Sequence, residues 1–158
     1  MPQIKAPISV SGSDAAWSKN GAGTTILCTS DHIASPDDGT YISNSGGDAI
    51  RVKIDPPDHP NKTTGLKMKC RCQGSGLGQE ISLRLFQGST GIADYGSISI
   101  ASGSFEDYEQ ELSESEAASI TDYSDLYLEV QSSTTDQLDE SVLELEAADS
   151  ILRVYVTT

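Results

Sequence analysis

Alternation of apolar and polar residues is the main pattern along the chain, and it predicts β-strands. In AIRVKI, residues 49–54, Ile50, Val52 and Ile54 fall on one side of an extended chain, while Arg51 and Lys53 fall on the other. The same period of two recurs at 66–73, 80–87, 125–130, 142–147 and 151–156. Weaker candidates lie around Ile26 and Tyr41 and at 92–101 and 105–112.

Turn-forming segments such as SPDDGT, NSGGD and QGSGLGQ separate these runs. Half-buried antiparallel sheets show such clean alternation, whereas buried parallel sheets show continuous apolar runs. We therefore predict an all-β fold, an antiparallel β-sandwich of jelly-roll type with about eight to ten strands. The expected organisation is an N-terminal arm at 1–20 followed by one domain at 21–158.

One phrase, SESEAASI at 113–120, has helical rather than strand character. Ser113 followed three residues later by Glu116 is a capping box, a signal for a helix N-terminus. We expect one or two helical turns that cross from one sheet to the other. Ala118 and Ile120 are expected to close the open end of the fold.

The charge is unevenly distributed along the sequence. The formal net charge is −14, which argues against broad binding to a nucleic-acid backbone. No lysine or arginine lies between Arg84 and Arg153, and that interval holds 16 of the 24 acidic residues. One interpretation is a solvated acidic surface; the other is that acidic and basic faces meet between subunits or on a partner. If the strands that carry the basic residues share one sheet, its outer face is basic.

Three cysteines, Cys28, Cys70 and Cys72, do not form a disulfide framework, and we interpret them as small buried residues. A bridge from Cys28 to one of the other two is the alternative. No zinc-ligand spacing is visible. We predict no cofactor, and structural calcium held by clusters such as Asp37-Asp38 or Asp122 with Asp125 remains an alternative to ordinary turn aspartates.

No catalytic arrangement stands out, and we predict that the protein is not an enzyme. His32 and His59 lie in loop-like contexts without a nucleophile motif. Carboxylates are too abundant for a pair to indicate a glycosidase. The glycine-rich GSGLG at 74–78 lies between two strands, which predicts a hairpin loop rather than a phosphate-binding loop.

Residues 65–130, with the closing RVYV, resemble a β-sandwich module of virion structural proteins from tailed bacteriophages. The resemblance rests on ISLRLFQGSTGIA and FEDYEQELSESEAASITDYSDLYLEV, and DGTYI and DPPDHP also fit. The matching residues are Leu85, Gln87, Gly88, Thr90, Ile92, Ala93, Phe105, Tyr108, Leu112, Ser113, Glu116, Ala117, Ile120, Thr121, Asp122, Tyr123, Asp125 and Leu126.

The resemblance implies a module that decorates capsids, builds head fibres or forms part of tail structures. A single stand-alone domain favours a capsid decoration, or cement, protein on the virion surface, and we expect it to form dimers or trimers and to bind the major capsid protein. The chain shows no secretory signal and no apolar run of about 18 residues, so we expect synthesis in the host cytoplasm, no membrane partner and no nucleic-acid partner. The expected contacts are the outward basic residues and an N-terminal arm that adds a strand to a partner. These are Pro2, Ile4, Ile8, Arg51, Lys53, Lys67, Lys69 and Arg71.

The alternative is a carbohydrate-binding module of similar architecture on a phage tail or host-facing spike. It would stack sugars on exposed aromatic residues, with calcium as an optional ion. The candidates are Trp17, Tyr41, Tyr95, Tyr127 and Tyr155, which show no stripe in the sequence.

Overall fold

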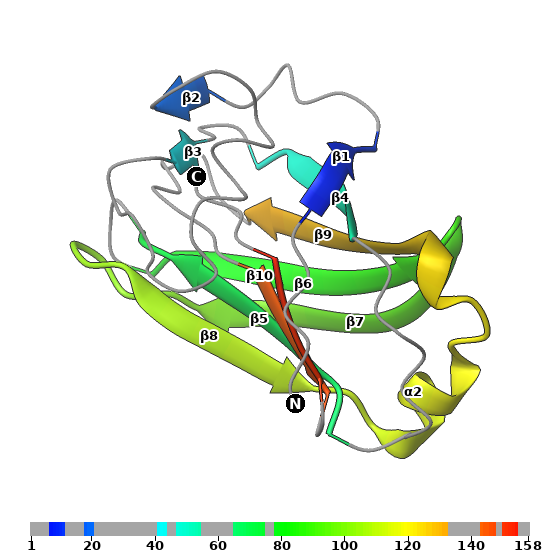
Figure 1. Cartoon of the computed structure of the whole chain (residues 1–158). Helices are drawn as coiled ribbons and strands as arrows, with labels where there is room; N and C mark the ends of the chain where they lie inside the picture. Colours follow the sequence, from blue (N-terminus) through cyan, green and yellow to red (C-terminus); the bar gives the residue numbers. More distant parts are fainter. Residues whose placement is uncertain are drawn as a thin grey trace.

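The computed structural model describes residues 7–11, 18–20, 41–43, 47–54, 65–74, 78–132, 143–147 and 150–154, which are mostly antiparallel β-structure. The largest sheet has the order β1-β4-β9-β6-β7, and its neighbours all pair antiparallel. Its strands are β1 (Pro7–Val10), β4 (Ala49–Ile54), β9 (Leu126–Ser132), β6 (Glu80–Gln87) and β7 (Thr90–Ser99). Figure 1 shows this sheet along the middle of the molecule.

A four-stranded antiparallel sheet has the order β11-β10-β5-β8. Its strands are β11 (Ser150–Val154), β10 (Leu143–Ala147), β5 (Lys67–Cys72) and β8 (Glu106–Glu111). A two-stranded sheet pairs β2 (Ser18–Asn20) with β3 (Tyr41–Ser43). The predicted strand runs are thus confirmed where the structure describes them, and the run around Ile26 lies outside the described residues.

The core follows the period-two pattern of the sequence. Inward positions of β4, β5, β6 and β9 are buried, and those outward positions whose burial the structure describes are half-buried, apart from the exposed Ala49. One hydrophobic cluster combines residues of both larger sheets with residues around α2 (Glu114–Ser119). The side chains that are fully buried and largest are Ile50, Ile54, Leu66, Met68, Ile81, Leu83, Leu85, Leu126 and Leu128.

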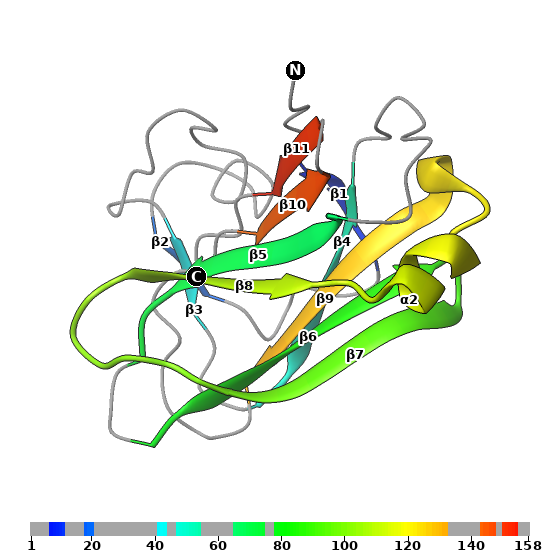
Figure 2. The ribbon, with the colours of Figure 1, turned by 90° about the horizontal axis from the view of Figure 1, so that it is seen from below.

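The predicted helix crosses between the sheets as expected, because β8 and β9 belong to different sheets. Figures 1 and 2 place α2 at the end of the molecule where β8 leads to β9. The capping box is complete: Glu116 N donates to Ser113 Oγ at 3.3 Å, and Ser113 N donates to Glu116 Oε2 at 2.8 Å. A 3-10 turn, η1 (Tyr123–Asp125), then leads into β9.

The expected role of Ala118 was wrong. Ala118 is exposed, whereas Ala117 and Ile120 are buried. Residues three apart on a helix share a face, and the cap at Ser113 sets the phase that turns Ala117 inward. Ile120 ends the helix, and its N–H donates to Ala117 O at 3.2 Å.

Two tyrosines connect the sheets along the side where β7 and β8 are the outermost strands. Tyr95 of β7 has its hydroxyl 3.0 Å from the carbonyl oxygen of Glu111, at the end of β8. In the reverse direction, Ala101 N donates to the hydroxyl of Tyr108 of β8 at 2.6 Å. Each hydrogen bond joins a tyrosine side chain of one sheet to the backbone in, or just after, a strand of the other sheet. Together the two bonds oppose separation of β7 from β8.

Two of the three cysteines behave as predicted. Cys70 and Cys72 are free thiols in the core, 1% and 0% exposed. Burial, followed by a side-chain hydrogen bond with Cys70, raises the pKa of the Cys72 thiol well above its ordinary value. Such a thiol stays protonated and packs as a small apolar group. Cys28 lies outside the described residues.

Across the described ranges, no helix is both long enough and apolar enough to cross a bilayer.

Candidate functional site

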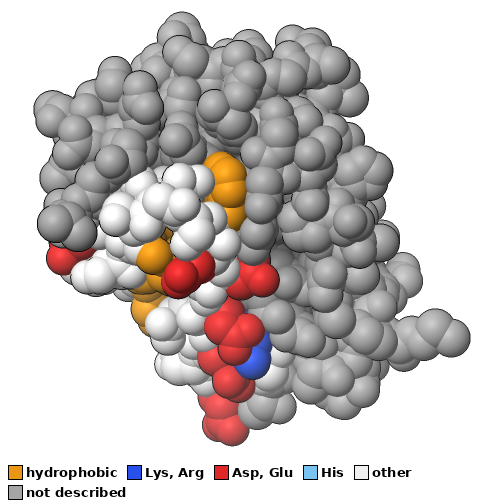
Figure 3. Space-filling view, turned by 90° about the vertical axis from the view of Figure 1, so that its left-hand side faces the viewer, with side chains coloured by type: hydrophobic (Ala, Val, Ile, Leu, Met, Phe, Trp, Pro, Cys, Tyr) orange, Lys and Arg blue, Asp and Glu red, His pale blue; other side chains and the backbone are white. Residues whose placement is uncertain are grey.

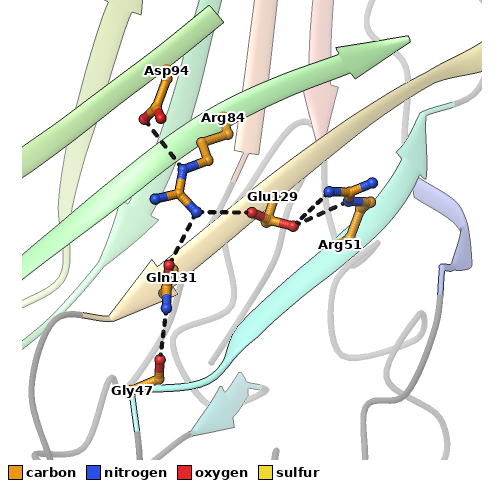
Figure 4. Close-up of polar contacts among 6 residues, drawn as sticks. All are labelled: Gly47, Arg51, Arg84, Asp94, Glu129 and Gln131. Atoms are coloured by element: carbon orange, nitrogen blue, oxygen red, sulfur yellow. Dashed lines mark hydrogen bonds and ion pairs between the residues drawn. The ribbon is translucent and has the colours of Figure 1, made fainter. Parts of the chain in front are cut away.

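A row of alternating charges crosses the outer face of the five-stranded sheet. The register places Arg51 of β4 opposite Glu129 of β9, Glu129 opposite Arg84 of β6, and Arg84 opposite Asp94 of β7. Opposite charges in neighbouring strands attract one another at this spacing. Three ion pairs connect the four side chains (Figure 4), and two cations and two carboxylates make the row formally neutral.

Glu129 is the centre of this charge row. Its Oε2 accepts from Arg51 Nη2 at 2.9 Å and from Arg51 Nε at 3.1 Å, and its Oε1 accepts from Arg84 Nη1 at 3.2 Å. The Glu129 side chain is only 12% exposed. The hydrogen bond that Arg84 donates to Glu129 is the largest cause that raises the pKa of Arg84 above its ordinary value. The carboxylate therefore fixes two guanidinium groups in a planar, preorganised arrangement.

The network also reaches the start of β4. Arg84 Nη1 donates to Gln131 Oε1 at 3.1 Å, and Gln131 Nε2 donates to the carbonyl oxygen of Gly47 at 3.1 Å (Figure 4). Gly47 has a φ of 74°, a conformation that glycine adopts without strain. The row is thereby connected from β7 across to the chain entering β4.

A second row on the same face is aromatic. The register places Lys53, Tyr127, Phe86 and Gly91 side by side across β4, β9, β6 and β7. The Arg51 guanidinium stacks 3.7 Å from the centre of the Phe86 ring, and Lys53 Nζ lies 5.5 Å from that of Tyr127. Lys53 also lies 3.7 Å from Asp125. Arginine and aromatic side chains held in this way are characteristic of binding surfaces.

The outer face also has a hollow above β7, because Gly91 supplies no side chain beside Phe86. An open pocket of about 270 Å³ lies there, and its lining includes Arg84, Asp94 and, from α2, Glu116. Although burial raises the pKa of Glu116, hydrogen bonds from Ser113 Oγ and N and from the Tyr95 hydroxyl outweigh that effect, and the pKa is lowered. The pocket therefore has a guanidinium and two carboxylates around an apolar floor.

The strands that carry the outward basic residues do not share one sheet, so the expectation of a single basic outer face was wrong. β4 and β6 belong to the five-stranded sheet, whereas β5 and β11 belong to the four-stranded sheet. Alternation assigns residues to a face of a strand but does not identify the neighbouring strand, which is why the sequence could not decide this. Arg51 and Lys53 therefore lie on one sheet and Lys67 on the other.

The acidic and basic parts of the sequence meet within the chain. The basic strand β5 lies between β8 and β10, both from the acidic part, with Lys67 in register with Glu111 and Glu146, and Lys69 with Glu109 and Glu144. Lys67 Nζ lies 2.9 Å from Glu109 Oε1. Figure 3, on the side where β8 begins, shows acidic side chains in a band with a basic side chain beside them.

The remaining predicted partner-binding residues are placed only in part. Residues 7–10 form β1 and pair with β4 in their own sheet, so this part of the arm is an edge strand of the protein itself. Pro2 and Ile4 lie outside the described residues. Ile8, Lys69 and Arg71 lie in described strands, but their side chains do not belong to the described part of the structure. Partner binding by these residues stays a prediction.

Several of the residues that carry the sequence resemblance described above make contacts at the crossover between β8 and β9. Gln87 Oε1 accepts from Thr121 N at 2.8 Å and from Asp122 N at 2.9 Å, and Gln87 Nε2 donates to Thr121 Oγ1 at 3.0 Å. Gly88 N donates to Asp125 O at 2.9 Å. Gly88 has a φ of 57°, and a Cβ there would lie 2.9 Å from Asp125 Oδ2. These residues therefore fix the end of the β6–β7 hairpin to α2 and η1.

The aspartates considered for calcium have other roles where they are described. Asp122 Oδ1 accepts from Ser124 N at 2.9 Å and from Ser124 Oγ at 2.6 Å, which is a turn cap. Asp125 pairs with Lys53. Among the described residues no group of three or more histidine, cysteine or acidic side chains gathers in a metal-binding arrangement, and Asp37 and Asp38 lie outside them.

Of the aromatic residues considered for sugar stacking, Tyr95 packs against the core and Tyr127 lies beneath Lys53. Trp17 and Tyr155 lie outside the described residues, and the side chain of Tyr41 does as well. Sequence reasoning missed Phe86 as a surface aromatic residue of the site, and Glu129 and Asp94 as the partners of Arg84. Their outward positions in the alternating runs were the only signal.

No protein-family model matches the chain, and no curated protein matches it.

Proposed function

We propose that the protein is a non-enzymatic virion structural protein, a capsid decoration protein that oligomerises and binds the lattice of the major capsid protein. The resemblance described above supports this proposal at the level of the fold. The outer face of the five-stranded sheet supports it at the level of the surface, because charges and aromatic rings there are paired, fixed in position and spread across four strands.

The finer architecture in this proposal is a β-sandwich of jelly-roll type. Successive strands alternate between the two larger sheets at β4–β5, β5–β6, β7–β8, β8–β9 and β9–β10. One hydrophobic cluster includes residues of both sheets. These features are what two facing sheets require, since each sheet then buries its apolar side against the other.

The observation that carries the proposal is the Arg51–Glu129–Arg84–Asp94 row with Phe86 stacked on Arg51. Preorganised arginine and aromatic side chains lose little conformational entropy on binding, so they are effective anchors of protein interfaces. A broad, electrically neutral face suits a flat protein partner. A partner that binds only the assembled lattice stabilises that lattice by mass action.

Co-sedimentation tests this function, using capsids assembled from the major capsid protein encoded near this chain. We expect Phe86→Ala to weaken capsid binding at least tenfold, because the half-buried ring is the apolar anchor of the face and positions Arg51. Asp107→Asn, an exposed change on β8 of the other sheet, is the matched control and should bind like the native protein. Absence of capsid binding by the native protein, or equal binding by Phe86→Ala, would refute the proposal.

A test of the N-terminal arm must leave residues 7–10 in place, because they form β1. Deletion of residues 2–6 removes Pro2 and Ile4 and keeps β1 paired with β4. We expect this deletion to weaken capsid binding while the thermal unfolding midpoint stays unchanged. Sedimentation equilibrium measures the oligomer, and a monomer at micromolar concentration would contradict the oligomeric part of the proposal.

A further inference from the structure

The hollow above β7 has the size and chemistry of a small-ligand site. Gly91 is exposed and lies opposite Phe86, and a Cβ on Gly91 would meet only the edge of that ring, at 3.9 Å. The pocket of about 270 Å³ lies just below the range of roughly 300–1,000 Å³ typical of drug-sized ligands. A ligand there would be small, with one side against Phe86 and Ile92.

One nitrogen of the Arg84 guanidinium, Nη2, is available at this pocket. Nη1 is occupied by Glu129 and Gln131. Nε is buried and lies 3.2 Å from Asp94 Oδ1, but this contact lacks the direction of a hydrogen bond. Within the described residues Nη2 has no hydrogen-bond partner, and Figure 4 shows no contact to it. Nη2 is therefore the guanidinium nitrogen that can donate to an oxygen atom of a ligand.

The charges around this edge select against ions of either sign. Asp94, with its side chain 64% exposed, and Glu116 repel an anion, and together with Glu129 they outnumber the guanidinium that would otherwise attract it. Arg84 repels a cation at the same place. A hydroxyl group both donates and accepts, so two neighbouring hydroxyls can accept from Arg84 and donate to Asp94.

We infer that this hollow binds one neutral sugar ring, with adjacent hydroxyls beside Arg84 Nη2 and the exposed Asp94 carboxylate and its C–H groups against Ile92 and the edge of Phe86. A sugar ring has apolar C–H groups on its faces and hydroxyl groups around its rim. It can therefore contact the apolar floor and the polar edge of the hollow at the same time. The hollow shares Arg84, Asp94 and Phe86 with the face proposed to bind capsids, but sugar binding does not require a capsid. Gly91→Leu fills the hollow and leaves the charge row unchanged, so it separates the two functions.

Titration of the ¹⁵N-labelled protein with D-glucose, D-galactose and N-acetyl-D-glucosamine tests the inference. We expect at least one of them to shift the backbone amide signals of Gly91 to Asp94. Glucuronate and N-acetyl-lysine methylamide serve as the anionic and cationic probes. Gly91→Leu fills the hollow, and its φ lies outside the positive range, so the strand should tolerate it. Asp94→Ala removes the acceptor, and Asp107→Asn is the control.

The expected result is saturable binding of a neutral sugar that Gly91→Leu and Asp94→Ala each weaken at least tenfold, while Asp107→Asn and all thermal midpoints stay unchanged. No shift with any neutral sugar overturns the inference. Binding of N-acetyl-lysine methylamide in its place also overturns it and would make the hollow a receptor for a partner's basic side chain. Loss of sugar binding with intact capsid binding separates this site from the proposed function.

Discussion

The hydroxyl of Tyr95 on β7 lies 2.8 Å from Oε2 of Glu116 on α2. The same carboxylate oxygen accepts from Ser113 N at 2.8 Å and from Ser113 Oγ at 2.6 Å. The capping box therefore has a second function besides starting the helix, because its glutamate also ties α2 to the edge of the five-stranded sheet. The Tyr95 hydroxyl in turn lies near the end of β8, so one cluster joins β7, β8 and α2.

Alkaline pH should weaken this cluster through Tyr95. Burial, and then the contact with Glu116, raises the pKa of Tyr95 from 10.0 to about 12. The neutral hydroxyl is thus favoured in the folded state, and its stabilising contribution is complete below pH 10 and lost as the pH rises through about 12. Tyr95→Phe should be less stable than the native protein at pH 8, and the difference should shrink above pH 10. Urea unfolding across this range measures it, and a constant difference would contradict the prediction.

Acidic pH should weaken the same cluster through Glu116. Its pKa is lowered from 4.5, because the hydrogen bonds from Ser113 and Tyr95 outweigh the effect of burial. The stabilisation is therefore complete above pH 4.5 and lost as the pH falls through the lower folded-state value. Glu116→Gln should lose less stability on acidification than the native protein. Glu114→Gln, in the same helical turn but exposed, should follow the native curve, and identical curves for all three proteins would show that Glu116 is not responsible.

Gln87 should contribute more to stability than its half-buried position suggests. Its Oε1 accepts from the N–H groups of Thr121 and Asp122, which have no alternative helical partner at the crossover. Gln87→Ala leaves both donors without this acceptor and should lower the free energy of unfolding by about 1–2 kcal/mol. Gln87→Glu keeps the acceptor and should cost less. Equal losses for the two variants, measured by urea denaturation, would mean that the amide oxygen is not the important group.

The sequence predicted the buried rows and the capped helix because both depend on neighbours in the chain. Ile50, Leu83 and Leu128 lie inward because period two is a property of a single strand. The charge row could not be predicted in this way, since Arg51 and Glu129 are 78 residues apart and Arg84 and Glu129 are 45 apart. Such pairs depend on the order of strands within a sheet, which alternation does not encode.

The helix phase and the location of the hollow were likewise beyond sequence reasoning. In a helix as short as α2, two adjacent alanines fit an apolar face about equally well, and the cap decided for Ala117 over Ala118. The hollow depends on the register that places Gly91 opposite Phe86, and a bulge between Leu85 and Phe86 shifts that register. A bulge of this kind has no clear signature in one sequence.

Replacing Ser97 by glycine should stabilise the protein. Ser97 has a φ of 59°, and it lies where the β6–β7 register shifts between Ile81 and Leu83. A left-handed conformation costs a residue with a Cβ roughly 1–2 kcal/mol, part of which glycine loses again through its greater freedom in the unfolded chain. We expect a net gain of about 0.5–1 kcal/mol for Ser97→Gly. Ser99→Gly, at an exposed position of the same strand without positive φ, should be destabilising, and a stabilising effect of both changes would refute the explanation.

Charge reversal at Lys67 should destabilise the four-stranded sheet in a salt-dependent way. Lys67 pairs with Glu109 and lies in register with Glu111, so Lys67→Glu places a carboxylate beside these two acidic residues of β8. Like charges on neighbouring strands repel, and we expect a loss of about 1 kcal/mol at low salt, where screening is weak. Lys67→Gln removes the attraction without adding repulsion and should lose less. At about 1 M salt the Debye length is about 3 Å, so the difference between the two variants should largely disappear. If the difference persists at high salt, the loss arises from packing of the lysine side chain rather than from charge, and the pairing of the acidic and basic parts of the chain is not what stabilises this sheet.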